Sequence, residues 1–166
     1  MLVIGIGNPS RGDDAVGPLL AARLDALVAR IGAHDAVEVL CDQQLMVEHA
    51  LDVEDRSAVI FIDAAVGTAG QVQCEPVVPA VGLPVLSHRC SPGQLLGLVA
   101  STLQRPSPPA WTVSVAGHGF ELGAPLHPTT AQAVETAWSM LLAQLNRCGV
   151  TLPDITTTPP IGSANA

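Results

Sequence analysis

The chain opens with Leu2-Val3-Ile4-Gly5-Ile6-Gly7-Asn8-Pro9-Ser10-Arg11-Gly12-Asp13-Asp14-Ala15-Val16-Gly17. The run Leu2–Ile6 is short and apolar, which predicts a buried β-strand. A glycine-rich turn and two adjacent aspartates follow, and then an amphipathic pattern predicts a helix from Asp14 to about Ile31. In an open α/β sheet, the carboxyl end of a strand and the start of the next helix form the usual ligand site. The aspartates are therefore either helix-capping residues, the interpretation favoured for Asp13, or part of a reactive site.

Length and composition indicate one α/β domain. The chain has 166 residues, of which 48% are hydrophobic and only 2% aromatic. Such a composition suits a parallel sheet rich in Val and Ile that is covered by helices rich in Ala and Leu. We expect the domain to span residues 1–152. Residues 153–166 are rich in Thr, Pro and Ser, which predicts a disordered tail.

Charge and hydropathy exclude several classes of protein. The formal net charge is −8, and the seven basic residues are not clustered, which argues against a nucleic-acid partner. No apolar stretch is long enough to span a bilayer, and the start of the chain lacks the basic residues of a signal peptide. The four cysteines form no CxxC motif, so we expect reduced, buried thiols in a cytoplasmic protein. They are Cys41, Cys74, Cys90 and Cys148.

Further strands and helices alternate along the rest of the chain. Strands are predicted at residues 36–41, 58–62, 71–78 and 111–116, and helices at 44–51, 91–103 and 128–147. Pro76 and Pro79 remove backbone donors, so the strand at 71–78 is expected at an edge of the sheet. Trp111 and Trp138 are expected in the core.

Three residues follow predicted strands or precede a predicted helix: Asp14, Asp63 and His88. Asp63 comes directly after the apolar run 58–62, and His88 lies in a loop before the helix at 91–103. Such positions converge on one crevice of an α/β sheet. Two carboxylates and an imidazole suit Zn, Ni, Fe or Mn, and they are also a possible acid/base set. The other histidines are expected to be surface or structural residues, although His118 also follows a strand.

The glycine turn does not match a dinucleotide-binding fingerprint. Gly5-Ile6-Gly7 could open such a motif, but its third glycine would fall at Ser10, and Pro9 interrupts the loop. NAD or FAD binding is therefore not expected.

Several segments together resemble the [NiFe]-hydrogenase maturation endopeptidases. The first consists of Gly5-Ile6-Gly7-Asn8 and Gly12-Asp13-Asp14-Ala15-Val16-Gly17. The others are Ile60-Phe61-Ile62-Asp63-Ala64-Ala65-Val66-Gly67, then Ser87-His88 with Leu95-Leu96, and finally Gly119-Phe120-Glu121-Leu122-Gly123. Members of that family remove a short C-terminal extension from the hydrogenase large-subunit precursor once nickel is installed.

The resemblance implies a fold, a partner and a set of site residues. The fold would be a three-layer sandwich of the phosphorylase/hydrolase-like type, with a twisted, mostly parallel sheet of about five strands between helices. The residues matching the family's metal contacts are Asp14, Asp63 and His88. The protein would then be a cytoplasmic, aspartyl-type endopeptidase, and its nickel would be supplied by the precursor.

One segment departs from the family pattern. Many members carry Asp-Gly-Gly-Thr after the second strand, whereas this chain has Cys41-Asp42-Gln43-Gln44-Leu45. With Glu48 downstream, this variant resembles the proteases that serve cytoplasmic NAD(P)-linked, bidirectional hydrogenases. Asp42 and Asn8 are candidate residues for recognising the precursor.

Two other functions remain open. Peptidyl-tRNA hydrolases also begin with a strand and Gly-x-Gly-Asn-Pro, but their Arg-His-Asn-type segment is replaced here by Arg11-Gly12-Asp13-Asp14, and a charge of −8 is unsuited to tRNA. A non-enzymatic assembly factor that binds nickel or the precursor is the other alternative. Whether nickel would polarise the scissile carbonyl, activate water or only mark the substrate is also left open.

Overall fold

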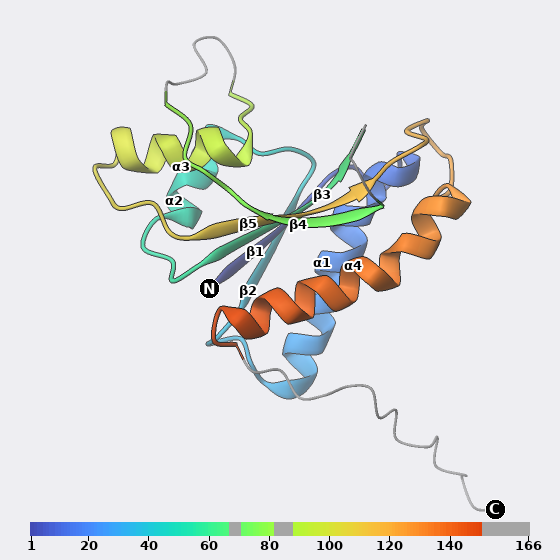
Figure 1. The fold of residues 1–166 in the computed structure, drawn as a ribbon, viewed down its shortest axis with the longest axis horizontal. Coiled ribbons are helices and arrows are strands. Elements are labelled where there is room, and N and C mark those ends of the chain that lie inside the picture. Colours follow the sequence, from blue (N-terminus) through green and yellow to red (C-terminus); the bar gives the residue numbers. More distant parts are fainter. Residues whose placement is uncertain (67–70, 82–87, 151–166) are drawn as a thin grey trace, which may run out of the picture.

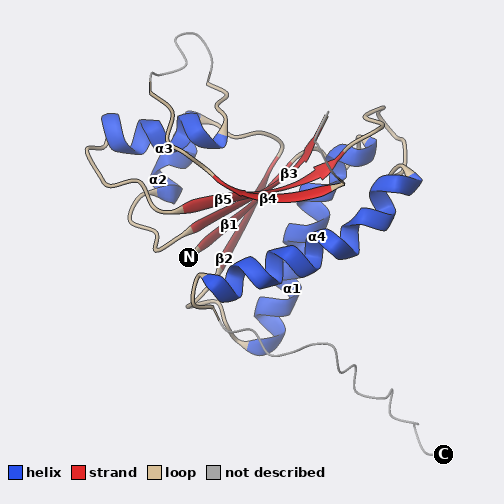
Figure 2. Cartoon of the chain, viewed as in Figure 1, coloured by secondary structure: helices blue, strands red, loops and turns tan. Residues whose placement is uncertain are grey.

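A five-stranded sheet with the order β2-β1-β3-β5-β4 forms the centre of the molecule. The computed structural model describes residues 1–66, 71–81 and 88–150. Four strands are parallel, and the edge strand β4 runs antiparallel to β5. The strands cross at successive angles, which gives the sheet its twist (Figure 2). Their bounds are Leu2–Ile6 (β1), Glu38–Asp42 (β2), Val59–Ala65 (β3), Val72–Pro76 (β4) and Ala110–Ala116 (β5).

Helices cover both faces of this sheet (Figure 1). Helices α1 (Val16–Ile31) and α4 (Pro128–Arg147) lie on one face, and α2 (Ala50–Val53) and α3 (Pro92–Ser101) lie on the other. Two short 3-10 turns, η1 (Gly12–Ala15) and η2 (Val47–His49), precede α1 and α2. This arrangement confirms the predicted α/β fold with a mostly parallel sheet between helices.

The side chains of the central strands alternate between two apolar cores. On β1, Val3 packs toward α1 and α4, whereas Leu2 and Ile4 pack toward α2 and α3. On β3, Ile60 and Phe61 alternate in the same way. Each of these five side chains is fully buried. The continuous apolar runs in the sequence therefore correspond to strands that are covered on both faces.

Helix α1 packs directly against the end of β1 because of a glycine. A Cβ at Gly17 would collide with the backbone oxygen of Ile6 and lie 2.8 Å from the backbone oxygen of Ile62. The start of α1 therefore rests on the two strands that flank the predicted site, closer than any larger residue allows.

The predicted elements are confirmed, although several of their bounds differ by one or more residues. Three of these differences lie near the predicted site. Helix α1 begins at Val16 rather than at Asp14, because a 3-10 turn comes first. Strand β3 continues to Ala65, so Asp63 lies within the strand and not after it. The segment 44–51, predicted as one helix, begins with a β-bridge between Met46 and Arg89 and continues as the 3-10 turn η2 before α2 starts at Ala50.

The expectations for individual residues are mixed. All four cysteines are free thiols, but Cys41 is exposed on edge strand β2 and the other three are only half-buried. Trp138 is buried in the core beneath Arg23, whereas Trp111 is half-buried. Within the described ranges, no helix is both long and apolar enough to cross a membrane. The predicted tail, residues 153–166, lies outside these ranges.

Candidate functional site

The candidate site lies where the direction of the strand order changes. From β1 the chain passes through α1 to β2 on one side, and from β2 it returns through α2 to β3 on the other side of β1. The carboxyl ends of β1 and β3 are therefore neighbours with connections that diverge, which is the usual position of a ligand site in such sheets. Asp14 and Asp63 come from the segments at this point.

The glycine turn after β1 brings Asn8 against Asp14. Gly7 has a φ of 133°, and a Cβ there would collide with the backbone oxygen of Asp14. The chain can then turn so that the N–H of Asn8 donates to Asp14 Oδ2 over 2.9 Å. The Asn8 side chain is used locally, since its Oδ1 accepts from the N–H of Ser10 at 2.9 Å. The predicted role of Asn8 in recognition stays a prediction.

Asp14 and Asp63 line the same cavity, which has a volume of about 360 Å³. Its wall is completed by residues from the segment after β2 and from the start of α3, namely Gln43, Gln44, Leu45, Arg89, Cys90, Ser91 and Pro92 together with Ile6 and Ala64. A larger groove of about 640 Å³ lies between α1 and β2, but its lining is mostly apolar. The cavity that holds both carboxylates is therefore the better candidate for chemistry.

Burial, which is the largest cause, and the negative charge of Asp14 together raise the pKa of Asp63 to about 6, although a hydrogen bond with the backbone of Ala64 opposes the shift. The position of Asp63 inside β3 explains this burial. A carboxyl group with a pKa near 6 exchanges protons close to neutral pH, which is the property required of a general acid or base.

His88 lies at the rim of this region and does not line the cavity. Its side chain is 77% exposed, and its Nδ1 lies 3.5 Å from Glu48 Oε1. The backbone of His88 pairs with the segment after β2, because the N–H of Val47 donates to the carbonyl of His88 at 2.9 Å. The structure thus brings together two of the three predicted ligands and holds the third on a neighbouring segment.

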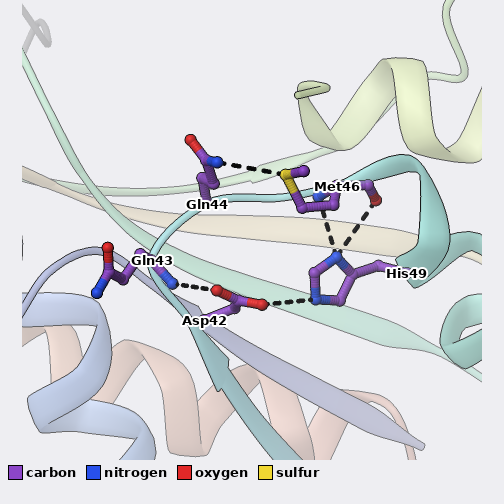
Figure 3. A network of polar contacts seen from close by, with 5 residues as sticks. All are labelled: Asp42, Gln43, Gln44, Met46 and His49. Atoms are coloured by element: carbon purple, nitrogen blue, oxygen red, sulfur yellow. Dashed lines mark hydrogen bonds and ion pairs between the residues drawn. The ribbon is translucent and has the colours of Figure 1, made fainter. Parts of the chain in front are cut away.

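Asp42 is the last residue of β2, and its side chain contacts residues of the segment that follows it (Figure 3). Its Oδ1 accepts from the N–H of Gln43 at 2.6 Å, and its Oδ2 lies 3.4 Å from Nε2 of His49. Nδ1 of His49 lies 3.0 Å from the backbone nitrogen of Met46 and 3.2 Å from its carbonyl oxygen, so the ring is held between Met46 and Asp42. This network fixes the connection that carries Gln43 and Gln44 into the cavity wall.

The prediction that Asp13 caps its own helix is wrong. The residue preceding α1 is Ala15, and Asp13 lies inside η1 with its side chain fully buried. Its carboxylate accepts from the N–H groups of His118 and His127, both at 2.7 Å, and from Thr130 Oγ1 at 2.8 Å. His127 is the N-cap of α4, so Asp13 serves the start of the last helix instead of the first.

Burial acts to raise the pKa of Asp13, but the hydrogen bonds from His118, His127, Thr130 and Gly119 outweigh it and hold the pKa below its usual value. The group is therefore an ionised structural carboxylate at neutral pH.

The sequence did not point to most of the cavity wall. Arg89, Cys90 and Ser91 reach the cavity because residues 45–47 pair with residues 88–90. No local sequence pattern predicts that pairing, although the two paired segments adjoin the candidate residues Asp42 and His88. Among the described residues, no group of three or more His, Cys, Asp or Glu side chains is arranged to hold a metal ion.

The structure is similar to solved structures of hydrogenase maturation proteases. It matches a hydrogenase maturating endopeptidase from E. coli with a TM-score of 0.66 and 23% identity, over 89% of this chain and 93% of that one. The solution structure of an endopeptidase from Escherichia coli matches with a TM-score of 0.66 and 25% identity, over 90% and 95% of the two chains.

A third match extends to the archaea. The [NiFe] hydrogenase maturation protease HycI from Thermococcus kodakarensis KOD1 matches with a TM-score of 0.63 and 19% identity, over 88% of this chain and 91% of that chain. No protein-family model matches the chain, and no curated protein matches its sequence. The resemblance found in the sequence motifs is thus confirmed, since the chain has the fold of the hydrogenase maturation proteases and is consistent with a peptide hydrolase.

Proposed function

We propose that this protein is an endopeptidase that removes the C-terminal extension of a [NiFe]-hydrogenase large-subunit precursor after nickel insertion. The observation that carries the proposal is the shared cavity of Asp14 and Asp63 at the strand-order switch, on the fold of the hydrogenase maturation proteases. The precursor would already hold its nickel when it binds, so the metal belongs to the substrate and not to the protease. The Gln43-Gln44 variant of the segment after β2 favours a precursor of the NAD(P)-linked type.

The donor set fits a nickel ion that arrives with the substrate. Carboxylate oxygens and imidazole nitrogen both bind borderline divalent metals. Asp14 and Asp63 would contact the nickel from the cavity, and His88 would approach from the rim. The side chain of His88 is exposed and lies against Glu48, so its imidazole is accessible to a docking protein. The metal, when bound, supplies a Lewis acid that also marks a correctly loaded precursor.

The residues of the chain could then handle the proton transfers of peptide hydrolysis. Asp63 has a pKa of about 6, so both its protonated and ionised forms are populated near neutral pH. Cleavage needs a proton to be accepted from the attacking water and another to be given to the leaving amine. A half-buried carboxyl group that shares a cavity with a second carboxylate is suited to this exchange.

The test is mass spectrometry of the large-subunit precursor with and without nickel. We expect a loss of mass equal to the extension for the nickel-loaded precursor, and very slow cleavage of the nickel-free one. Asp63→Asn should slow cleavage even at saturating precursor, because it removes an anionic ligand and nearly keeps the shape. Asp35→Asn, an exposed carboxylate before β2, is the matched control and should behave like the wild type.

Three other outcomes would contradict the proposal. Equal cleavage of both precursors would remove nickel as the recognition mark. A stable complex with no loss of mass would indicate an assembly factor that binds without cutting. Release of free peptide and tRNA from peptidyl-tRNA by the same preparation would favour the peptidyl-tRNA hydrolase alternative.

A further inference from the structure

We infer that Asp13 is a positioning residue, which holds the turn bearing Asp14 in its reactive place by anchoring the loop between β5 and α4. The inference rests on the proposed function for the role of Asp14. It concerns a different residue, however, one whose contacts are all internal to the protein.

The carboxylate of Asp13 is the meeting point of four donors. Oδ2 accepts from the N–H of His118 at 2.7 Å, from the N–H of Gly119 at 3.1 Å and from Thr130 Oγ1 at 2.8 Å. Oδ1 accepts from the N–H of His127 at 2.7 Å. Each donor lies more than a hundred positions later in the chain, so this single side chain fixes the position of a distant segment.

The backbone around Asp13 is bound to the same loop. The N–H of Asp13 donates to the carbonyl of Gly119 at 2.8 Å, and the N–H of Gly12 donates to Ala124 at 3.2 Å. In return, the N–H of Gly123 donates to the carbonyl of Ser10 at 2.7 Å. The 3-10 turn that carries both aspartates is therefore held from its backbone and from the Asp13 side chain.

Asp13 cannot itself touch a substrate, because its side chain is fully buried. Asp14, the next residue in the turn, lines the cavity and accepts the N–H of Asn8. The two consecutive carboxylates therefore have different roles. Asp13 fixes the turn against the β5–α4 loop, and this fixed turn directs Asp14 into the cavity.

An amide cannot replace the Asp13 carboxylate. If the oxygen of an Asn occupied the place of Oδ2, its NH₂ group would face the N–H of His127. In the flipped orientation the NH₂ group would face the N–H groups of His118 and Gly119. Either orientation sets donor against donor, so Asp13→Asn must move the loop or the turn.

The experiment compares Asp13→Asn and Thr130→Val with the wild type and the charge-matched control Asp35→Asn. The structural arm uses the backbone amide proton shifts of Asn8, His118, Gly119 and His127. In Asp13→Asn we expect the hydrogen-bonded shift to be lost at the amides that face the new NH₂ group, either His127 or His118 and Gly119. We also expect it to change at Asn8, which donates to Asp14 and not to Asp13. Thr130→Val removes one of the donors to Asp13, and valine has nearly the same shape as threonine. This variant should therefore give smaller changes in the same direction, with the fold retained.

The kinetic arm measures kcat and KM on the nickel-loaded precursor. We expect kcat to fall by about 100-fold in Asp13→Asn and several-fold in Thr130→Val, with KM nearly unchanged, because misplacing a reacting group lowers the rate more than the binding. Normal kcat together with an unmoved Asn8 amide in folded Thr130→Val or Asp13→Asn would overturn the inference. If the wild type does not cleave, the proposed function fails, and the Asn8 shift still decides the positioning role.

Discussion

Asp14 and Asp63 come from different segments, 49 positions apart by their numbering, yet both residues line one cavity, and the charge of Asp14 contributes to the raised pKa of Asp63. Like charges at close range oppose one another's ionisation. The pair is therefore electrostatically unfavourable in the free protein, and a divalent cation held between the two groups would relieve that repulsion. The cost of keeping both carboxylates in one cavity is measurable in the absence of substrate.

Asp63→Asn should stabilise the free protein at neutral pH. The pKa of Asp63 is about 6 in the folded protein and near 3.8 when unfolded, so between these values the native state binds a proton that the unfolded state has lost. Wild-type stability therefore falls as the pH rises through this window. We expect the variant to gain about 1–3 kcal/mol at pH 7 and nothing below pH ~4, measured by urea unfolding. A variant no more stable at pH 7 would contradict the shift, and Asp35→Asn controls for net charge.

Asp14→Asn should lower the pKa of Asp63 without restoring it to its ordinary value. Burial is the largest cause of the raised pKa and stays in the variant, whereas the repulsion from Asp14 is removed. The measurement is the carboxyl ¹³C shift of Asp63 followed through a pH titration. A midpoint that does not move would show that the two groups do not interact across the cavity.

Free Ni²⁺ should bind weakly, and His88→Ala should abolish that binding. Two carboxylates and one imidazole leave coordination positions open, and His88 must move from Glu48 to reach a metal held by the aspartates. Isothermal calorimetry of the wild type, His88→Ala and His34→Ala gives the comparison, since His34 is an exposed histidine on the turn before β2. Undiminished binding in His88→Ala would place the metal elsewhere, with the cysteines as the first candidates.

Gly17→Ala should destabilise the protein and impair the site together. The added methyl group meets the backbone oxygens of Ile6 and Ile62, which cannot move without shifting β1 and β3. We expect a loss of about 1–3 kcal/mol in the free energy of unfolding, since overpacking against backbone outweighs the better helix propensity of alanine. Ala29→Ser, on the exposed side of the same helix, should change stability by well under 1 kcal/mol. Equal unfolding midpoints for the two variants would contradict the close contact.

The sequence predicted the elements whose pattern is local. Leu2–Ile6 and the apolar run that becomes β3 are strands buried on both faces, and their composition alone shows this. The spacing of apolar residues likewise predicted α4, which buries Ala137, Trp138 and Leu141. The positions of Asp14 and Asp63 at neighbouring strand ends followed from the α/β topology.

What could not be predicted depends on contacts between distant segments. An aspartate before a helix is usually its cap, so the local pattern assigned Asp13 to α1, whereas its donors lie at residues 118–130. The pairing of Met46 with Arg89 has no local pattern either, and it determines which residues form the cavity wall. The extension of β3 past Asp63 was hidden because Ala64 and Ala65 are compatible with either a strand or a loop.

The distance along the chain between Asp13 and its donors has a consequence for how the protein is made. Synthesis on the ribosome proceeds from the N-terminus, so the segment with Asp14 and Asp63 emerges well before Thr130. Until the start of α4 has left the exit tunnel, the Asp13 carboxylate lacks two of these donors, the N–H of His127 and the hydroxyl of Thr130. On the inferred role of Asp13, a chain that stops in β5 would carry both cavity aspartates without the contacts that position Asp14. Emergence of the first turn of α4, rather than of the whole helix, would then complete the contacts of Asp13 and with them the placement of Asp14.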